Sequence, residues 1–126
     1  MINTLEHVDD STALKEAYRI CKKNVIFSVP HKEEGRLGMY GIIFSSYRDQ
    51  SHLRYYTLRS VESTFADAGF RTDESNYHGP INPLGLFLST LHLAHSFSTL
   101  VGNMVNRIPI IKKHYVNIEG IATKVE

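Results

Sequence analysis

The chain has little of several features that mark whole classes of protein. It has a single cysteine, Cys21, so no internal disulfide can form, which suits a reducing compartment. Its 14 lysine and arginine residues balance 13 aspartate and glutamate residues, and a net charge of +1 excludes the basic surface typical of nucleic-acid-binding proteins. The start carries Glu6, Asp9 and Asp10 without a basic n-region, so no signal peptide is visible and we expect a cytoplasmic protein. Nucleophile-elbow, P-loop and zinc-binding motifs are also missing.

One long segment lacks charge altogether: residues 81–106 contain no Asp, Glu, Lys or Arg. Apolar residues fill most of it, and one polar stripe runs along it at helical spacing: Ser89, His92, Ser96, Thr99 and Asn103. The pattern is typical of a buried helix pair. Two alternatives stay open: a wall over an apolar substrate or a membrane surface, and a membrane span. His92 and His95 have a spacing that metal ligands use, but no third ligand is evident, so we expect no metal site.

The first half of the chain alternates between helix and strand signals. Residues 9–12 offer helix-capping side chains, and apolar residues then recur at helical spacing: Ala13, Leu14, Ala17, Ile20 and Cys21. The run VIFSV, residues 25–29, ends at Pro30 and is typical of a strand buried on both faces of a parallel sheet. A strand in the first five residues would complete a βαβ unit.

The remaining residues predict a long loop, a second helix and late strands. Residues 31–50 show loop signals, and Thr57 then caps a helix that ends before Gly69. Residues 70–77 are a weak strand candidate, and the alternation over residues 116–123 predicts a final strand. With 42% hydrophobic and 21% charged residues, the 126-residue chain suits one globular domain.

Two stretches of the sequence resemble one known family. The first reads INTLEHVDDSTALKEAYRICKKNVIFSVPH and the second DQSHLRYYTLRSVESTFADAGF, and together they extend over residues 2–70. They resemble the second half of a class I S-adenosylmethionine-dependent methyltransferase domain. In that family a Leu-Glu-His-Val-like turn follows the fourth strand, an apolar fifth strand ends in Ser-Val-Pro, and a later helix ends in Ala-Gly-Phe. The two stretches stand in the family's order.

The resemblance implies an α/β fold, the C-terminal half of a Rossmann-like methyltransferase sheet with helices on its faces. The family's strand order is 3-2-1-4-5-7-6, so the remnant would have the order 4-5-7-6 with the last strand antiparallel. Residues 1–79 would form this core, residues 80–110 a helical insertion on the substrate side, and residues 111–126 the final strand of a single partial domain. The family's glycine-rich turn and acidic ribose-binding residue have no counterpart here. We therefore expect a fragment that begins at an internal methionine within strand four and is inactive by itself.

The resemblance also indicates site residues. The turn after strand four lies beside the cofactor, S-adenosyl-L-methionine, and its positions here are Thr4, Leu5, Glu6 and His7. His31 and His52 stand at the end of the sheet where α/β proteins bind ligands, and they are the candidate general bases. A structural role in a loop is the alternative for both. Tyr40, Tyr55 and Tyr56 are candidates for a substrate-pocket wall, with packing as their alternative role.

The sequence therefore predicts a fragment of a methyltransferase that acts on a small-molecule or lipid-like acceptor. The uncharged segment would supply an apolar substrate wall. Two alternatives remain, a non-catalytic binding or scaffold remnant that pairs with a partner, and a membrane-surface protein that contacts lipid through residues 83–106. None of these readings involves nucleic acid.

Overall fold

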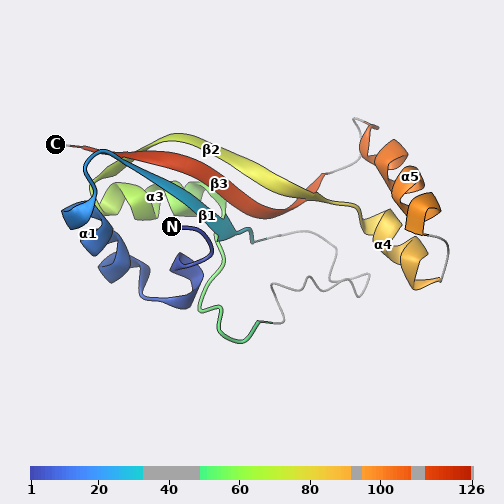
Figure 1. The fold of residues 1–126 in the computed structure, drawn as a ribbon, viewed down its shortest axis with the longest axis horizontal. Coiled ribbons are helices and arrows are strands. Elements are labelled where there is room, and N and C mark those ends of the chain that lie inside the picture. The colour runs from blue at the N-terminus through green and yellow to red at the C-terminus, as the bar shows by residue number, and fades with distance from the viewer. Residues whose placement is uncertain (33–48, 92–94, 109–112, 126) are drawn as a thin grey trace. The chain divides into compact units, whose positions relative to one another are not determined.

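The computed structural model describes residues 1–32, 49–91, 95–108 and 113–125 (Figure 1). The elements in chain order are η1 (Leu5–His7, a short 3-10 helix), α1 (Asp10–Ile20), β1 (Asn24–Pro30), α3 (Leu58–Asp67), β2 (Phe70–Ile81), α4 (Pro83–Thr90), α5 (His95–Asn106) and β3 (His114–Lys124). They divide into two compact units. Residues 1–33, 44–79 and 115–126 form the first unit, and residues 34–43 and 80–114 form the second.

The three strands form an antiparallel sheet in the order β1-β3-β2, so the described fold is mixed α/β (Figure 1). β1 runs antiparallel to β3, from Asn24 opposite Thr123 to Pro30 opposite Asn117. Both of the strands predicted over residues 25–29 and 116–123 are therefore present. The weak strand candidate at residues 70–77 is also a strand, and it is longer than predicted, because β2 continues to Ile81.

The start of the chain lies along the edge of β1 that does not pair with β3. Ile2 forms a parallel bridge with Ser28. The Ser28 amide donates to the Met1 carbonyl over 3.0 Å, and the Asn3 amide donates to the Ser28 carbonyl over 2.9 Å. The predicted first strand is thus reduced to one bridge, since the chain turns into η1 at Leu5. The resulting order of neighbours is the chain start, β1, β3 and β2.

The two helices of the first unit begin where the sequence predicts. The Asp9 side chain caps α1 by accepting from the Thr12 amide over 2.9 Å. Thr57 and Ser60 form a reciprocal capping box at the start of α3. After α3 the chain reverses at Gly69, which has a φ of +89°. A Cβ on Gly69 would also lie within 2.8 Å of the Tyr18 ring, so both backbone and space require glycine there.

Both helices pack on one face of the sheet, and the core lies between them and the strands (Figure 1). The core side chains come from every element of the unit: Leu5, Leu14, Phe27, Val29, Tyr56, Val61, Phe65, Phe70, Ile118 and Ala122. Gly120 lies opposite Phe27 in the register, and a Cβ there would collide with the Phe27 ring. The glycine therefore makes room for the aromatic ring at the centre of the core.

Two expectations about burial in the first unit are wrong. β1 was expected to be buried on both faces, but Ile26 is 62% exposed, because the helices of this unit cover the other face of the sheet. Ile20 was assigned to the buried stripe of the first helix, but it is exposed at the last turn of α1. The stripe instead consists of Leu14 with Ala13, Ala17 and Cys21 partly buried beside it.

The second unit contains α4 and α5, which pack against each other. Asn82 caps α4 by accepting from the Gly85 amide over 2.9 Å, and its side chain also lies against Gly102 of α5, where a Cβ would overlap it. The segment 83–106 is helical where it is described, as predicted. The predicted burial of this helix pair is wrong for α5, because Phe97, Leu100 and Met104 are 53%, 59% and 62% exposed. Of the expected polar stripe, Ser96, Thr99 and Asn103 are exposed, whereas His92 lies outside the described residues. Within the described ranges, each helix is too short or too polar to cross a membrane.

Candidate functional site

A polar cluster forms where the turn η1 meets the loop that precedes α3. Leu5 is fully buried in the core and fixes the orientation of the turn. The next residue, Glu6, is only 1% exposed, and its carbonyl accepts from the Leu53 amide over 2.7 Å. This backbone hydrogen bond brings His52 beside the turn, with its ring centroid 4.7 Å from that of His7. The cluster consists of Glu6, His7 and His52.

The loop that carries His52 is held by a local turn around Asp49. The Asp49 carboxylate accepts from the Ser51 amide over 2.9 Å and from the Ser51 hydroxyl over 2.5 Å. The hydrogen bond from the Ser51 hydroxyl, followed by that from its amide, lowers the pKa of Asp49, so this side chain remains a carboxylate near neutral pH. Its other oxygen lies 3.6 Å from Nε2 of His52.

The Ser51 hydroxyl determines which nitrogen of His7 carries a proton when the ring is neutral. Nδ1 of His7 lies 3.0 Å from the Ser51 hydroxyl oxygen and 3.2 Å from the Ser51 carbonyl oxygen. Because the Ser51 hydroxyl donates its hydrogen to Asp49, Nδ1 of His7 is the donor in this contact. The lone pair of a neutral His7 therefore lies on Nε2, which is 3.8 Å from a carboxylate oxygen of Glu6.

Two atoms of the cluster are buried without a hydrogen-bond partner among the described residues. They are Oε2 of Glu6 and Nδ1 of His52. Arg54, which follows in the same loop, forms its ion pair with Asp10. Buried polar atoms of this kind are rare in folded proteins and call for a partner.

Tyr55 and Tyr56, both candidates for a substrate-pocket wall, lie beside the cluster in different environments. The Tyr55 ring is edge-on to His52 with 5.6 Å between centroids, and burial raises the pKa of Tyr55. Tyr56 is only 3% exposed and belongs to the core, and its hydroxyl lies 3.1 Å from a carboxylate oxygen of Asp10. Burial, and then the Asp10 charge, raises the pKa of Tyr56 far above its ordinary value. Tyr56 thus has the packing role that the sequence left open, while Tyr40 lies outside the described residues.

The structure places the two candidate general bases in different surroundings. His52 belongs to the cluster, whereas His31 lies elsewhere. Nδ1 of His31 is 3.2 Å from the Tyr56 carbonyl oxygen, and the His31 ring centroid is 4.8 Å from the ring centroid of Tyr77. Of the four positions assigned to the cofactor, Leu5 and Glu6 are buried, and Thr4 and His7 are exposed. Only the last two present side chains on the surface of the turn.

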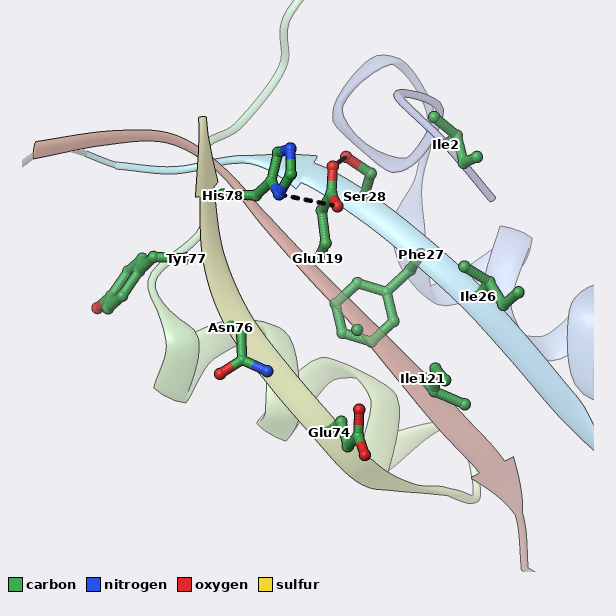
Figure 2. A pocket seen from close by; sticks show the side chains of 11 residues that line it. Ile2, Ile26, Phe27, Ser28, Glu74, Asn76, Tyr77, His78, Glu119 and Ile121 are labelled. Atoms are coloured by element: carbon green, nitrogen blue, oxygen red, sulfur yellow. Dashed lines mark hydrogen bonds and ion pairs between the residues drawn. The ribbon is translucent and has the colours of Figure 1, made fainter. Parts of the chain in front are cut away.

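A second candidate site lies on the face of the sheet opposite the helices. A shallow pocket of about 350 Å³ lies there, and Figure 2 shows the side chains that line it. Glu119 is at its upper end in this view, where it accepts from the Ser28 hydroxyl over 3.4 Å and pairs with Nδ1 of His78 at 3.5 Å. Ile26 and Ile121 form the apolar part (Figure 2). The pocket is open and its ion pair is exposed, so it offers less fixed chemistry than the cluster around the buried Glu6.

Sequence reasoning assigned His52 and Glu6 separately and expected no metal, so it missed the cluster as a unit. His7 and Ser51 are 44 positions apart, and no local pattern brings them together. The available signal was the pair of short polar motifs, LEH and SH, on either side of a predicted strand. Comparison with models of known protein families and with curated proteins finds no match for this chain.

Proposed function

We propose that this chain forms the C-terminal half of a class I S-adenosylmethionine-dependent methyltransferase domain acting on a small-molecule or lipid-like acceptor. The observation that carries the proposal is the order of neighbours in the sheet. The chain start, β1, β3 and β2 follow one another, with the first contact parallel and β3 antiparallel to β1. This order is consistent with the order 4-5-7-6 that the resemblance implies, in which the last strand of the chain is antiparallel.

The face of the sheet opposite α1 and α3 supports the same proposal. Ile2 and Ile26 are both more than half exposed on this face, opposite α1 and α3. An α/β sheet of this class carries helices on both faces. The exposed isoleucines are therefore the surface on which helices of the other half of the domain would pack. A scaffold remnant would use this same surface to hold a partner.

The described residues fit only part of the cofactor S-adenosyl-L-methionine. Thr4 and His7 are exposed on the turn η1, where the family places one wall of the cofactor site. The glycine-rich turn and the acidic residue that hold the rest of the cofactor in that family have no counterpart in this sequence. One wall leaves a ligand largely hydrated, so we expect dissociation constants of about a millimolar or weaker and no methyl transfer by this chain alone.

The proposal is tested by titrating the ¹⁵N-labelled chain with S-adenosylhomocysteine and following amide resonances. We expect weak, saturable shifts centred on residues 4–7, and no comparable shifts with ATP, which shares the adenosine part but not the homocysteine part. His7→Ala should reduce the shifts, and His78→Ala on the far face of the sheet should not. Shifts confined to other residues, no shifts at all, or micromolar binding would each contradict a half-site at this turn.

A second candidate function is contact with an apolar surface through the second unit. Phe97, Leu100 and Met104 follow helical spacing in α5 and are 53%, 59% and 62% exposed. Residues 81–106 contain no charged side chain. An exposed apolar face without charge favours binding to an apolar acceptor or a membrane surface.

A further inference from the structure

The cluster of buried Glu6, exposed His7 and half-buried His52 has the composition of a metal site. Each of the three residues offers one ligand atom, and these atoms all lie within 4.8 Å of one another. Two imidazoles and one carboxylate are a ligand set that zinc and neighbouring divalent metals use. In a tetrahedral site with bonds of roughly 2.1 Å, ligand atoms are about 3.4 Å apart, so a modest inward rotation of the side chains would close the set.

The polar contacts around the cluster leave one acceptor nitrogen on each histidine when its ring is neutral. Nδ1 of His7 donates to Ser51, which leaves Nε2 as the acceptor on the Glu6 side. Nε2 of His52 faces the Asp49 carboxylate, which leaves its buried Nδ1 as the acceptor. In metal sites a ligating histidine typically directs its other nitrogen to a carboxylate or a backbone carbonyl, and both of these partners are present here.

The acceptor atoms of the cluster lack a positive partner in the part of the chain that the structure describes. The Glu6 carboxylate is buried, one of its oxygens is unpaired, and its other oxygen faces Nε2 of His7 at 3.8 Å. A proton shared by Glu6 and His7 would serve that pair but would leave Nδ1 of His52 unpaired. A single cation between the three side chains would serve all of them.

We propose that Glu6, His7 and His52 bind one divalent transition-metal ion of the Zn²⁺ class, with Asp49 and Ser51 orienting the two imidazoles. Three protein ligands leave a coordination position open for water or for an oxygen of a small molecule, as in catalytic zinc sites. This site needs only residues of the present chain. The test of the metal site therefore does not depend on the proposed methyltransferase function.

The test is titration of the untagged chain with Zn²⁺ by isothermal titration calorimetry. We expect one ion per chain. His52→Ala removes a ligand and should weaken binding by more than about a hundredfold, whereas Asp49→Asn removes only an orienting partner and should weaken it roughly 10- to 100-fold. His78→Ala and Cys21→Ser are matched controls, because they remove other common zinc ligands from outside the cluster, and both should bind as the parent chain does.

A second measurement needs no variant and so does not depend on their folding. Mn²⁺ added at substoichiometric amounts should broaden the amide resonances of Glu6, His7 and His52 first, and excess Zn²⁺ should reverse the broadening. Absence of saturable Zn²⁺ binding would overturn the proposal. So would broadening centred on residues 92–95, or loss of binding in His78→Ala or Cys21→Ser while His52→Ala binds normally.

Discussion

The two units of the chain bury their apolar side chains to very different extents. In the first unit, Phe27, Phe65 and Phe70 are all nearly or fully buried between the sheet and its two helices. In the second unit, Phe97, Leu100 and Met104 of α5 are more than half exposed, and the described buried positions are Ile81, Ser98 and Gly102. A sheet with two amphipathic helices can close a core, whereas two short helices have too little surface to enclose one.

This difference suggests that the first unit mainly stabilises the fold and that the second unit mainly offers a surface for binding. The first unit contains the side chains whose burial stabilises the fold and also the polar cluster that is held by that core. The second unit contains an apolar surface that its own helices do not bury, and such surfaces commonly mark interaction sites. Mutations should therefore have opposite effects in the two units: large for stability in the first, and large for binding in the second.

The largest expected effect comes from a truncation in the core of the first unit. Phe65 is fully buried. Its ring centroid lies 4.5 Å from the ring centroid of Phe27 and 5.9 Å from that of Phe70. Phe65→Ala should lower the free energy of unfolding by about 3–5 kcal/mol, because it leaves a cavity between the helix and the sheet. Phe97→Ala, the same substitution on exposed α5, should cost less than about 1 kcal/mol. Urea unfolding followed by circular dichroism measures both, and equal costs would contradict the contrast between the units.

Features of the fold that depend on residues close together in the sequence were predictable, and features that depend on distant residues were not. The caps at Asp9 and Thr57 and the break at Gly69 depend on neighbours within a few residues, and the sequence predicts all of them. The strands of the sheet also follow from local patterns. The exposure of Ile26 and Ile20 was not predictable in this way, because it depends on which faces other parts of the chain cover.

The candidate site was predictable only in part for the same reason. The residues Glu6 and His52 were recognised as candidates one by one. Their meeting depends on the hydrogen bond from the Leu53 amide to the Glu6 carbonyl and on the turn at Asp49, which are tertiary and loop contacts. A pattern of spacing does not encode such contacts, so the cluster becomes visible only in the folded chain.

An intermediate effect is expected from acid, and it should fall on the first unit. The described carboxylates with a lowered pKa are Asp9, Asp49 and Asp73, and all three lie in that unit. Hydrogen bonds from Thr12, side chain and then backbone, lower the pKa of Asp9 from 3.8 to about 2. A lowered folded-state pKa stabilises the fold above the unfolded value, and this contribution is lost as the pH falls through the folded one. The stability of the chain should thus decrease between about pH 4 and pH 2.

Asp9→Asn distinguishes the contribution of the helix-capping hydrogen bond from the contribution of the Asp9 charge. Asparagine keeps an acceptor oxygen for the Thr12 amide but does not titrate, so the decrease in urea midpoint between about pH 4 and pH 2 should be shallower than in the parent chain. Asp67→Asn, at the exposed C-terminal end of α3, is the matched control and should retain the full decrease. An unchanged pH dependence in Asp9→Asn would show that the cap does not contribute to acid sensitivity.

The smallest effect on stability, and the largest on binding, is expected on the exposed face of α5. Replacing Phe97, Leu100 and Met104 together by serine should leave the unfolding transition nearly unchanged, because each side chain is more than half exposed. The same change removes most of the apolar area that α5 can place in a membrane interface, at roughly 25 cal/mol for each Å². In vesicle flotation, the parent chain should therefore float with phosphatidylcholine vesicles and the triple variant should remain in the lower fractions.

The lack of charge in this segment makes the flotation prediction more specific. Residues 81–106 contain no Lys or Arg, so adding anionic lipid or lowering the salt concentration should change flotation little. Ile26→Ser, on the exposed face of the sheet in the first unit, is the matched control, since it removes an equally exposed apolar side chain from the other unit. If Ile26→Ser abolishes flotation and the triple variant does not, the apolar surface that recognises lipid belongs to the sheet. Flotation that requires anionic lipid would instead assign lipid binding to the basic residues outside this segment. The exposed face of α5 would then be available for an apolar acceptor or another protein surface.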